Sequence, residues 1–220
     1  MRLQVYYDRT VRGTAIFKED RHNVDLDFQH RFPIGGRHDI VWGLGYRLTS
    51  DNEGNTFTVS LTPASRTMHL VSAFAQDEIV LMADRLHVTL GSKFEHNDFT
   101  GFEIQPGARL LWTPSDRHTV WAAIARAVRT PSRAEDDIRI NQQVLPPGTL
   151  FPGAPTAVAS FFGDRSIGSE KLLAYELGYR MQPTSGLPWT SQRFITCTTT
   201  CGASNPGPHF SKRRRSHRTW

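Results

Sequence analysis

The feature of this sequence that most limits its fold is a strict alternation of apolar and polar residues. In the segment HNVDLDFQHRF, Val24, Leu26 and Phe28 would share one face, while Asp25 and Asp27 would share the other. A period of two predicts β-strands, because successive side chains of a strand point to opposite sides. The same pattern recurs in these segments: 38–49, 102–112 and 170–180. Each segment is about ten residues long, more than the ~5–6 residues of a typical globular strand.

The connections between these segments carry a second signal. Short polar turns are expected at 33–38, 82–85 and 113–118. Longer connections are expected between them, at 10–21, 51–66, 95–101 and 129–169. Outer-membrane β-barrels have short turns at one end and long loops at the other, and their tilted strands span the bilayer with ~9–11 residues. The sequence therefore predicts an all-β fold, an antiparallel up-and-down meander that forms a partial transmembrane barrel of about eight strands.

A secreted β-sandwich is the rival architecture, since its strands also alternate. Strand length and loop alternation count against it, and so does the charge on the polar face. These residues carry that charge: Asp25, Asp27, Arg31, Glu103 and Arg109. A water-filled lumen would solvate them without an apolar partner.

The net positive charge of the chain comes entirely from its last 35 residues. Residues 186–220 hold six basic residues and no acidic one, whereas 1–185 hold 20 basic and 21 acidic residues, a net charge of −1. The arginine-rich string SKRRRSHR (211–218) is the only candidate for nucleic-acid binding, and we expect no such role. Both cysteines, Cys197 and Cys201, also lie there. We expect no zinc site, because such a site needs four ligands held by a folded region.

Several strings, in order, resemble the barrel domain of TonB-dependent outer-membrane receptors. AFAQDE (73–78) is similar to that family's strand-ending F-x-Q-D-E, and QPGARLLWTP (105–114) to its Q-P-x-x-R-L-x-W-x-P hairpin. RTPSR (129–133) resembles the motif that opens a large outer loop, and SEKLLAYELGYR (169–180) a strand beginning E-x-x-x-x-Y-E-L-G. The resemblance covers about 1–185.

The resemblance implies a receptor of the Gram-negative outer membrane that takes up siderophore-bound iron, cobalamin or another scarce ligand. Members of the family have 22 strands, a plug, and a peptide before it that contacts TonB. This sequence matches neither plug nor peptide, and its first residues show no export signal. We therefore expect part of a barrel wall that does not transport alone, with outer-membrane lipid as its partner. A soluble, envelope-associated or secreted β-sandwich binding protein is the alternative.

Residues 186–220 lose the alternation, the acidic residues and the resemblance together. Reading permitted codons for 190–202 from their third base recovers an alternating string similar to the family's next strand. The sequence thus predicts two regions: a partial receptor barrel at 1–185, and an irregular, disordered basic tail at 186–220 that is out of frame.

No residues point to catalysis, a cofactor or a metal, so we expect no enzyme, and the ligand-binding residues are unknown. The acidic run Glu135–Asp137 is predicted as a solvated part of the outer loop, with contact to a cationic ligand as the alternative. Seven histidines are expected in structural or solvated roles: His22, His30, His38, His69, His87, His96 and His118. Six aromatic residues are expected to face lipid or lie in its interfacial belts: Trp42, Tyr46, Trp112, Trp121, Tyr175 and Tyr179.

Overall fold

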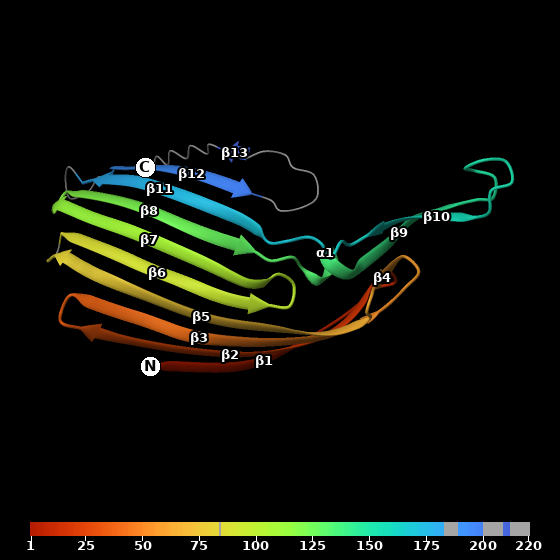
Figure 1. The fold of residues 1–220 in the computed structure, drawn as a ribbon, viewed down its shortest axis with the longest axis horizontal. Helices are drawn as coiled ribbons and strands as arrows, with labels where there is room; N and C mark the ends of the chain where they lie inside the picture. The colour runs from red at the N-terminus through yellow and green to blue at the C-terminus, as the bar shows by residue number, and fades with distance from the viewer. Residues whose placement is uncertain (84, 183–188, 200–208, 212–220) are drawn as a thin grey trace.

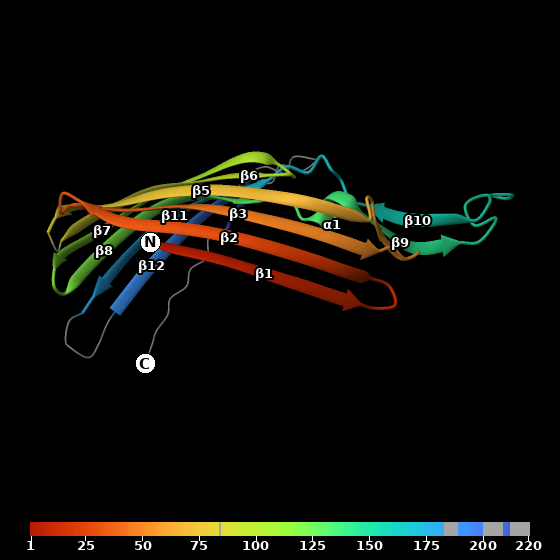
Figure 2. The ribbon, with the colours of Figure 1, turned by 90° about the horizontal axis from the view of Figure 1, so that it is seen from below.

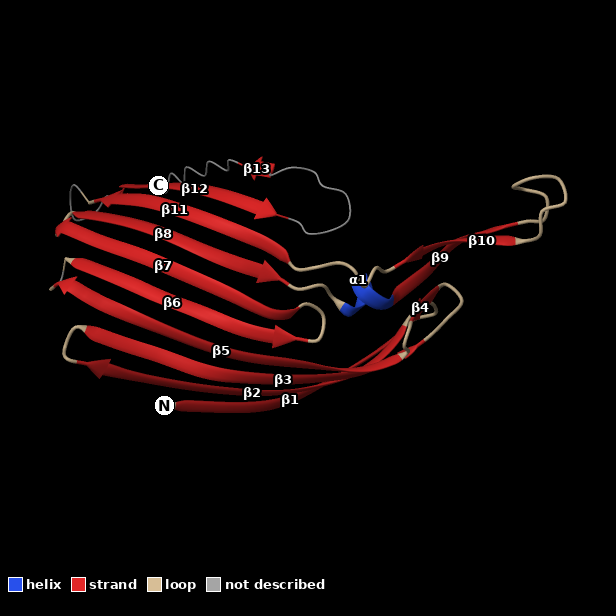
Figure 3. Ribbon diagram, viewed as in Figure 1, coloured by secondary structure: helices blue, strands red, loops and turns tan. Residues whose placement is uncertain are grey.

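The computed structural model describes residues 1–83, 85–182, 189–199 and 209–211. Strands make up most of this part of the chain, with one five-residue helix among them (Figure 3). Ten strands form one antiparallel sheet in the order β1-β2-β3-β5-β6-β7-β8-β11-β12-β13, an up-and-down meander (Figure 1). Helices long and apolar enough to cross a membrane are absent from the described residues.

The alternation predicts strands near 2–8, 22–32, 38–49, 68–80, 85–95, 102–112, 118–128 and 170–180; all eight are present, and each is longer than predicted. They are β1 (Arg2–Gly13), β2 (Lys18–Ile34), β3 (His38–Gly54), β5 (Ser65–Met82), β6 (Leu86–Asn97), β7 (Gly101–Ser115), β8 (His118–Arg129) and β11 (Glu170–Met181). The prediction of an all-β meander is therefore confirmed. The expected strand length of about ten residues is too short for the 17 and 18 residues of β2, β3 and β5.

The predicted tight turns join β2 to β3, β5 to β6 and β7 to β8 at one end of the sheet, which lies at the left in Figure 1 and which we call the lower end. Between β2 and β3, Gly35 and Gly36 have φ angles of 59° and 71°. Side chains with a Cβ rarely adopt this left-handed conformation, so consecutive glycines permit the hairpin.

The opposite, upper end corrects two of the expected long connections. β1 and β2 continue until only residues 14–17 separate them, and β6 and β7 are joined by residues 98–100. Polar side chains support both hairpins: Arg9 pairs with Asp20 at 2.8 Å, and the Asn97 side chain accepts hydrogen bonds from the amides of Phe99 and Thr100. Polar strand ends continue pairing after the apolar alternation stops, because the hydrogen bonds of the ladder do not depend on it.

The 129–169 connection is a structured region rather than an open loop. It contains α1 (Arg133–Asp137), β9 (Ile138–Leu145) and β10 (Ala157–Phe162). With β4 (Val59–Leu61), β9 and β10 form a second sheet in the order β10-β9-β4. This small sheet extends away from the upper end of the main sheet (Figure 1).

The register gives the main sheet two chemically different faces. Leu26 lies opposite Tyr46, and Tyr46 opposite Val71, on the apolar face; Asp25 lies opposite Arg47 on the polar face. Large side chains of the apolar face are open, with Leu44 51% exposed. The sheet is curved (Figure 2), and no second sheet packs face to face on it within the described residues. The arrangement is a partial barrel, not the sandwich considered as its rival.

The segment beyond residue 185 differs from the expectation of an irregular tail. β12 (Trp189–Thr199) pairs with β11 from Met181↔Trp189 to Lys171↔Thr199, and β13 (His209–Ser211) pairs with β12. The expectation is wrong for these residues: several are threonines, which favour strands, and the edge of β11 offers them a ladder. The rest of the predicted tail, 186–188, 200–208 and 212–220, lies outside the described residues.

Candidate functional site

Several charged residues on the polar face of the sheet are paired with neighbours on the same or the adjacent strand. Arg47 Nε donates to Asp25 Oδ2 at 2.6 Å, and Lys93 Nζ lies 2.8 Å from Glu95 Oε2. Such charged pairs across the face of a sheet fit a surface that water reaches. The expectation that this face carries solvated charge therefore agrees with the geometry.

Small residues hollow out the middle of the wall. Gly91 lies opposite Gly107, and Gly107 opposite Ala125, so three strands carry little side-chain volume side by side. A hollow of about 540 Å³ lies here, and Lys93 and Arg109 contribute to its lining. The wall thus presents a shallow depression whose lining includes two basic residues and one carboxylate, that of Glu78.

Trp121 corrects the expectation for the aromatic residues. It lies opposite Gly178 on the polar face, and its Nε1 donates to Glu176 Oε1 at 2.8 Å. A Cβ on Gly178 would come within 2.0 Å of the indole, so the glycine makes room for it. The other five aromatic residues share the apolar face, as expected: Trp42, Tyr46, Trp112, Tyr175 and Tyr179.

Five of the seven histidines bond to neighbouring strands. Three accept or donate at a tyrosine hydroxyl on the apolar face, in the pairs Tyr7–His22, Tyr46–His69 and Tyr179–His118. Two face carboxylates near the lower end, in the pairs His38–Asp77 and His87–Glu78. These are structural contacts between strands, and no group of three His, Cys, Asp or Glu suited to a metal occurs in the described part.

Helix α1 begins at a capping box at the upper end of the sheet. The Ser132 hydroxyl accepts from the Glu135 amide at 3.3 Å, and Glu135 Oε2 accepts from the Ser132 amide at 2.7 Å. This reciprocal pair satisfies backbone donors that a helix start leaves unbonded. A hydrogen bond from Arg129, followed by that from the Ser132 amide, lowers the pKa of Glu135 to about 2.

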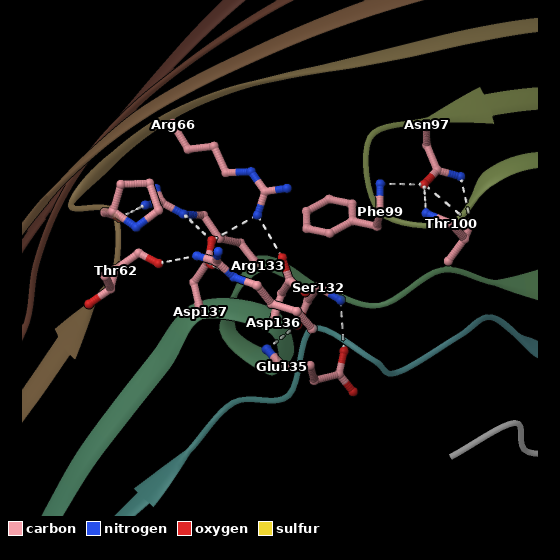
Figure 4. Close-up of polar contacts among 12 residues, drawn as sticks. Thr62, Arg66, Asn97, Phe99, Thr100, Ser132, Arg133, Glu135, Asp136 and Asp137 are labelled. Atoms are coloured by element: carbon pink, nitrogen blue, oxygen red, sulfur yellow. Dashed lines mark hydrogen bonds and ion pairs between the residues drawn. The ribbon is translucent and has the colours of Figure 1, made fainter. Parts of the chain in front are cut away.

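Six charged residues around α1 form what we call the outer ionic cluster, and Figure 4 labels four of them, Arg66, Arg133, Asp136 and Asp137. They are Asp51, Arg66, Arg133, Asp136, Asp137 and Arg165.

Arg133 and Asp51 form the most deeply buried pair of this cluster, with 6% and 2% of their surfaces exposed. Arg133 also donates to the carbonyl of Pro63, which lies in the connection before β5. Burial lowers the pKa of Arg133, and the nearby Asp137 carboxylate opposes that shift. The pair therefore holds α1 directly onto the upper part of β3.

Asp137 receives two further arginines. Arg66 Nη1 donates to Asp137 at 2.8 Å and to Asp136 at 2.7 Å, and Arg165 Nη2 donates to Asp137 at 2.6 Å. Burial opposes the ionisation of Asp137, but the bonds from Arg66 and Arg165 outweigh it, so its pKa lies below the ordinary value. The acidic run is thus neutralised internally, and the prediction of a solvated loop is wrong for Asp137.

An aromatic contact connects the cluster to the β6–β7 hairpin. The Arg66 guanidinium lies 4.8 Å from the centre of the Phe99 ring, within the range of a cation–π interaction (Figure 4). Phe99 is held in the β6–β7 turn by the Asn97 side chain. Arg165 adds a bond of 2.6 Å to the carbonyl of Thr62. The cluster therefore joins β3, β5, α1, the β6–β7 turn and the segment before β11.

Sequence reasoning missed the three arginines of this cluster, Arg66, Arg133 and Arg165. The string S-R-A-E (132–135) has the spacing of a capping box and could have located α1. The partners of the arginines lie up to 103 positions away in the sequence, which no local pattern shows. The side chains of Cys197 and of 212–218 lie outside the described residues, as does Cys201.

A sequence profile of the TonB dependent receptor-like β-barrel family matches residues 2–194. The chain belongs to this family. The match continues past residue 185, where the resemblance seen by eye ended, and includes part of β12. The family is one of transport proteins rather than enzymes. No curated protein matches the chain significantly.

Solved structures of receptors from this family have the same fold. The siderophore receptor PirA from Pseudomonas aeruginosa is 16% identical, with a TM-score of 0.72 over 96% of this chain and 40% of its own. The ferric enterobactin receptor PfeA mutant G324V, also from Pseudomonas aeruginosa, is 19% identical, with a TM-score of 0.68 over 82% and 27%. PirA from Acinetobacter baumannii is 12% identical, with a TM-score of 0.61 over 90% and 32%. This chain spans 27% to 40% of the lengths of these receptors.

Proposed function

We propose that this chain forms part of the wall of an outer-membrane receptor for the energised uptake of a scarce ligand. The observation that carries the proposal is the pairing of an uncovered apolar face with a charged polar face on one antiparallel sheet. In water, so much exposed apolar surface would promote association. In a bilayer it meets acyl chains, while the polar face borders an aqueous lumen.

Outer-membrane lipid is therefore the proposed partner of the apolar face. In the receptor family, TonB acts through the plug rather than the wall, so we do not expect these strands to transport by themselves. The ionic cluster would keep the outer region in place above the lumen. Its carboxylates are already occupied by arginines, so they are poor candidates for ligand contacts.

The proposed ligand class is a siderophore carrying iron, with cobalamin or a similar scarce compound as the alternative. Support comes from the similarity to receptors named for siderophores and for ferric enterobactin. The depression around Lys93 and Arg109 is lined by two basic residues against the one carboxylate of Glu78, and this excess would favour anionic groups over cationic ones. The individual ligand-binding residues remain unassigned.

The first test is whether the chain enters the outer membrane. The full chain, exported behind a secretion signal, is expected in outer-membrane extracts, protected from protease and with migration on gels that changes on heating. Leu44→Arg is the matched variant, since it places a charge on the apolar face. A soluble monomer that needs no detergent would contradict the proposal and favour a soluble binding protein.

The second test concerns uptake. Residues 1–199 would replace the matching wall segment of Pseudomonas aeruginosa PirA, and uptake of labelled ferric siderophore would be measured in a strain lacking that receptor. We expect uptake that an uncoupler of the proton gradient abolishes. A chimera that reaches the membrane in normal amounts but takes up neither ferric siderophores nor cobalamin would contradict the receptor function.

A further inference from the structure

The upper parts of β7 and β8 separate from each other. The strands pair from Gly107↔Ala125 downward, whereas residues 101–106 of β7 pair with β6 and the upper part of β8 pairs with β11. A hollow of about 510 Å³ lies at this separation, and the segment 165–169 contributes to its lining. The separation interrupts an otherwise continuous hydrogen-bonded wall.

Cationic side chains surround this hollow. Its lining includes three cations, Arg126, Arg165 and Lys171, against the single carboxylate of Glu103. Arg126 bridges the separation, since its Nη1 donates to the Ile104 carbonyl and its Nη2 lies 3.7 Å from Glu103. Arg165 is also bonded to Asp137, but its side chain is 62% exposed, and Lys171 is exposed too. The hollow therefore has positive charge in excess.

An apolar surface adjoins these cations on the same face of the sheet. Phe94 and Phe102 lie in ring contact, with centroids 6.4 Å apart, and are 39% and 60% exposed. Ile104, 40% exposed, lines the hollow itself. Register places Phe94 opposite Ile104, so the three form one patch. Apolar contact and cationic contact are thus available to one molecule at once.

We propose that this hollow binds the phosphate headgroup of an anionic membrane lipid whose acyl chain lies along Phe94 and Phe102. The inference rests on the proposed membrane placement, which brings lipid to the apolar face. Lys171 and Arg126 would contact the phosphate, because basic side chains next to an apolar surface favour anionic headgroups. Arg126 also links β7 and β8 across the separation through its bond to the Ile104 carbonyl.

The test uses the full chain reconstituted in phosphatidylcholine vesicles with or without phosphatidic acid, followed by extraction and measurement of retained lipid by native mass spectrometry. We expect selective retention of phosphatidic acid. Lys171→Gln should weaken it about fivefold, the size expected for one basic side chain beside an anionic lipid. Lys18→Gln is the matched control, an exposed lysine at the other side of the sheet, and should retain the parental selectivity.

A second variant separates a lipid site from a simple anion site. Phe102→Ser should weaken retention of phosphatidic acid without changing the effect of inorganic phosphate, which is expected to compete poorly. Equal retention by Lys171→Gln and the parent, or full displacement by inorganic phosphate at low concentration, would overturn the lipid site. A chain that inserts but shows no selectivity refutes this inference alone, whereas a chain that never inserts refutes the proposed function.

Discussion

The spanning part of the sheet and the outer ionic cluster differ in what their side chains are buried against. On the main sheet, large apolar residues such as Leu44 are exposed; the two buried hydrophobic residues of the described part of the chain, Leu61 and Ala154, both lie in the outer region. In the cluster, the buried residues are ions, among them Asp51 and Arg133. A soluble domain would show the reverse arrangement.

The difference shows that different interactions stabilise the sheet and the outer region. The strands are joined by backbone hydrogen bonds, and their apolar side chains gain stability only when lipid covers them. In the proposed membrane placement the outer region lies beyond the lipid, and desolvated ion pairs, rather than a hydrophobic core, fix its position. Loss of one partner of such a pair is costly because the remaining charge stays buried.

The largest effect is expected from Arg133→Ala. It should destabilise the outer region by about 3–5 kcal/mol, because Asp51 is left as an uncompensated buried charge. Hydrogen exchange across α1 and β9 in detergent micelles measures this effect, with exchange in β6 as the internal reference. Arg165→Ala, which removes a more exposed partner, should cost far less, about 0.2–1 kcal/mol. Equal losses in the two variants would contradict the view that burial sets the cost.

Next in size is Leu44→Arg, which places a charge on the apolar face. In a bilayer it should lower the free energy of unfolding by about 2–4 kcal/mol, the cost of an arginine near the midplane. Gln29→Arg is the control, because Gln29 lies opposite Gly43 on the polar face at the same level. Guanidinium titration in vesicles gives both values. If both variants lost the same stability, the assignment of the two faces would be wrong.

A smaller effect is expected from Gly178→Ala. The added methyl would meet Trp121 and push the indole away from Glu176. Overpacking of this kind costs about 1–3 kcal/mol. The double variant Gly178→Ala, Trp121→Phe should recover part of the loss in the same titration. Gly13→Ala, where the methyl meets no atom within 4 Å, serves as the control; a loss there as large as at Gly178 would exclude the steric explanation.

The smallest effect concerns the pH dependence of the capping box. The pKa of Glu135 is about 2 in the folded chain against an ordinary value of 4.5. Because its folded-state pKa is lowered, ionised Glu135 stabilises the folded chain above pH 4.5, and this contribution is lost as the pH falls toward 2. The parent and Glu135→Gln should therefore differ in the hydrogen-exchange protection of α1 above pH 4.5, and this difference should disappear as the pH falls toward 2. A difference that stays constant from pH 5 to pH 2 would show that the carboxylate is not the source.

Most of the wall could be predicted from sequence because its side chains obey one local rule. The pair Phe28 and Leu44 illustrates this, since alternation alone placed both on the apolar face and the register confirms it. Trp121 could not be assigned in this way, because its position depends on the space above Gly178 on another strand. Strand ends beyond the alternating segments were also missed, since polar pairing continues without an apolar signal.

The outer region was far less predictable. Arg133 contacts residues from β3 and from the connection before β5, and such distant pairing leaves no periodic trace in the sequence. β12 was missed because its composition resembled a tail, whereas its pairing depends on the exposed edge of β11. The predicted change of reading frame near 181–190 stays a prediction, which the gene sequence tests directly.

The unequal lengths of the strands give the upper rim a slope. β2, β3 and β5 have 17 or 18 residues, whereas β6, β8 and β11 have 12, and the lower turns start level (Figure 1). Five extra residues at ~3.3 Å each, on strands tilted by ~40°, raise one side by roughly 12 Å. In the proposed receptor, a molecule that diffuses toward this rim meets a higher wall at β2, β3 and β5 and a lower wall at β6, β8 and β11. We expect this difference in height to favour approach from the lower side, before a molecule reaches any binding group.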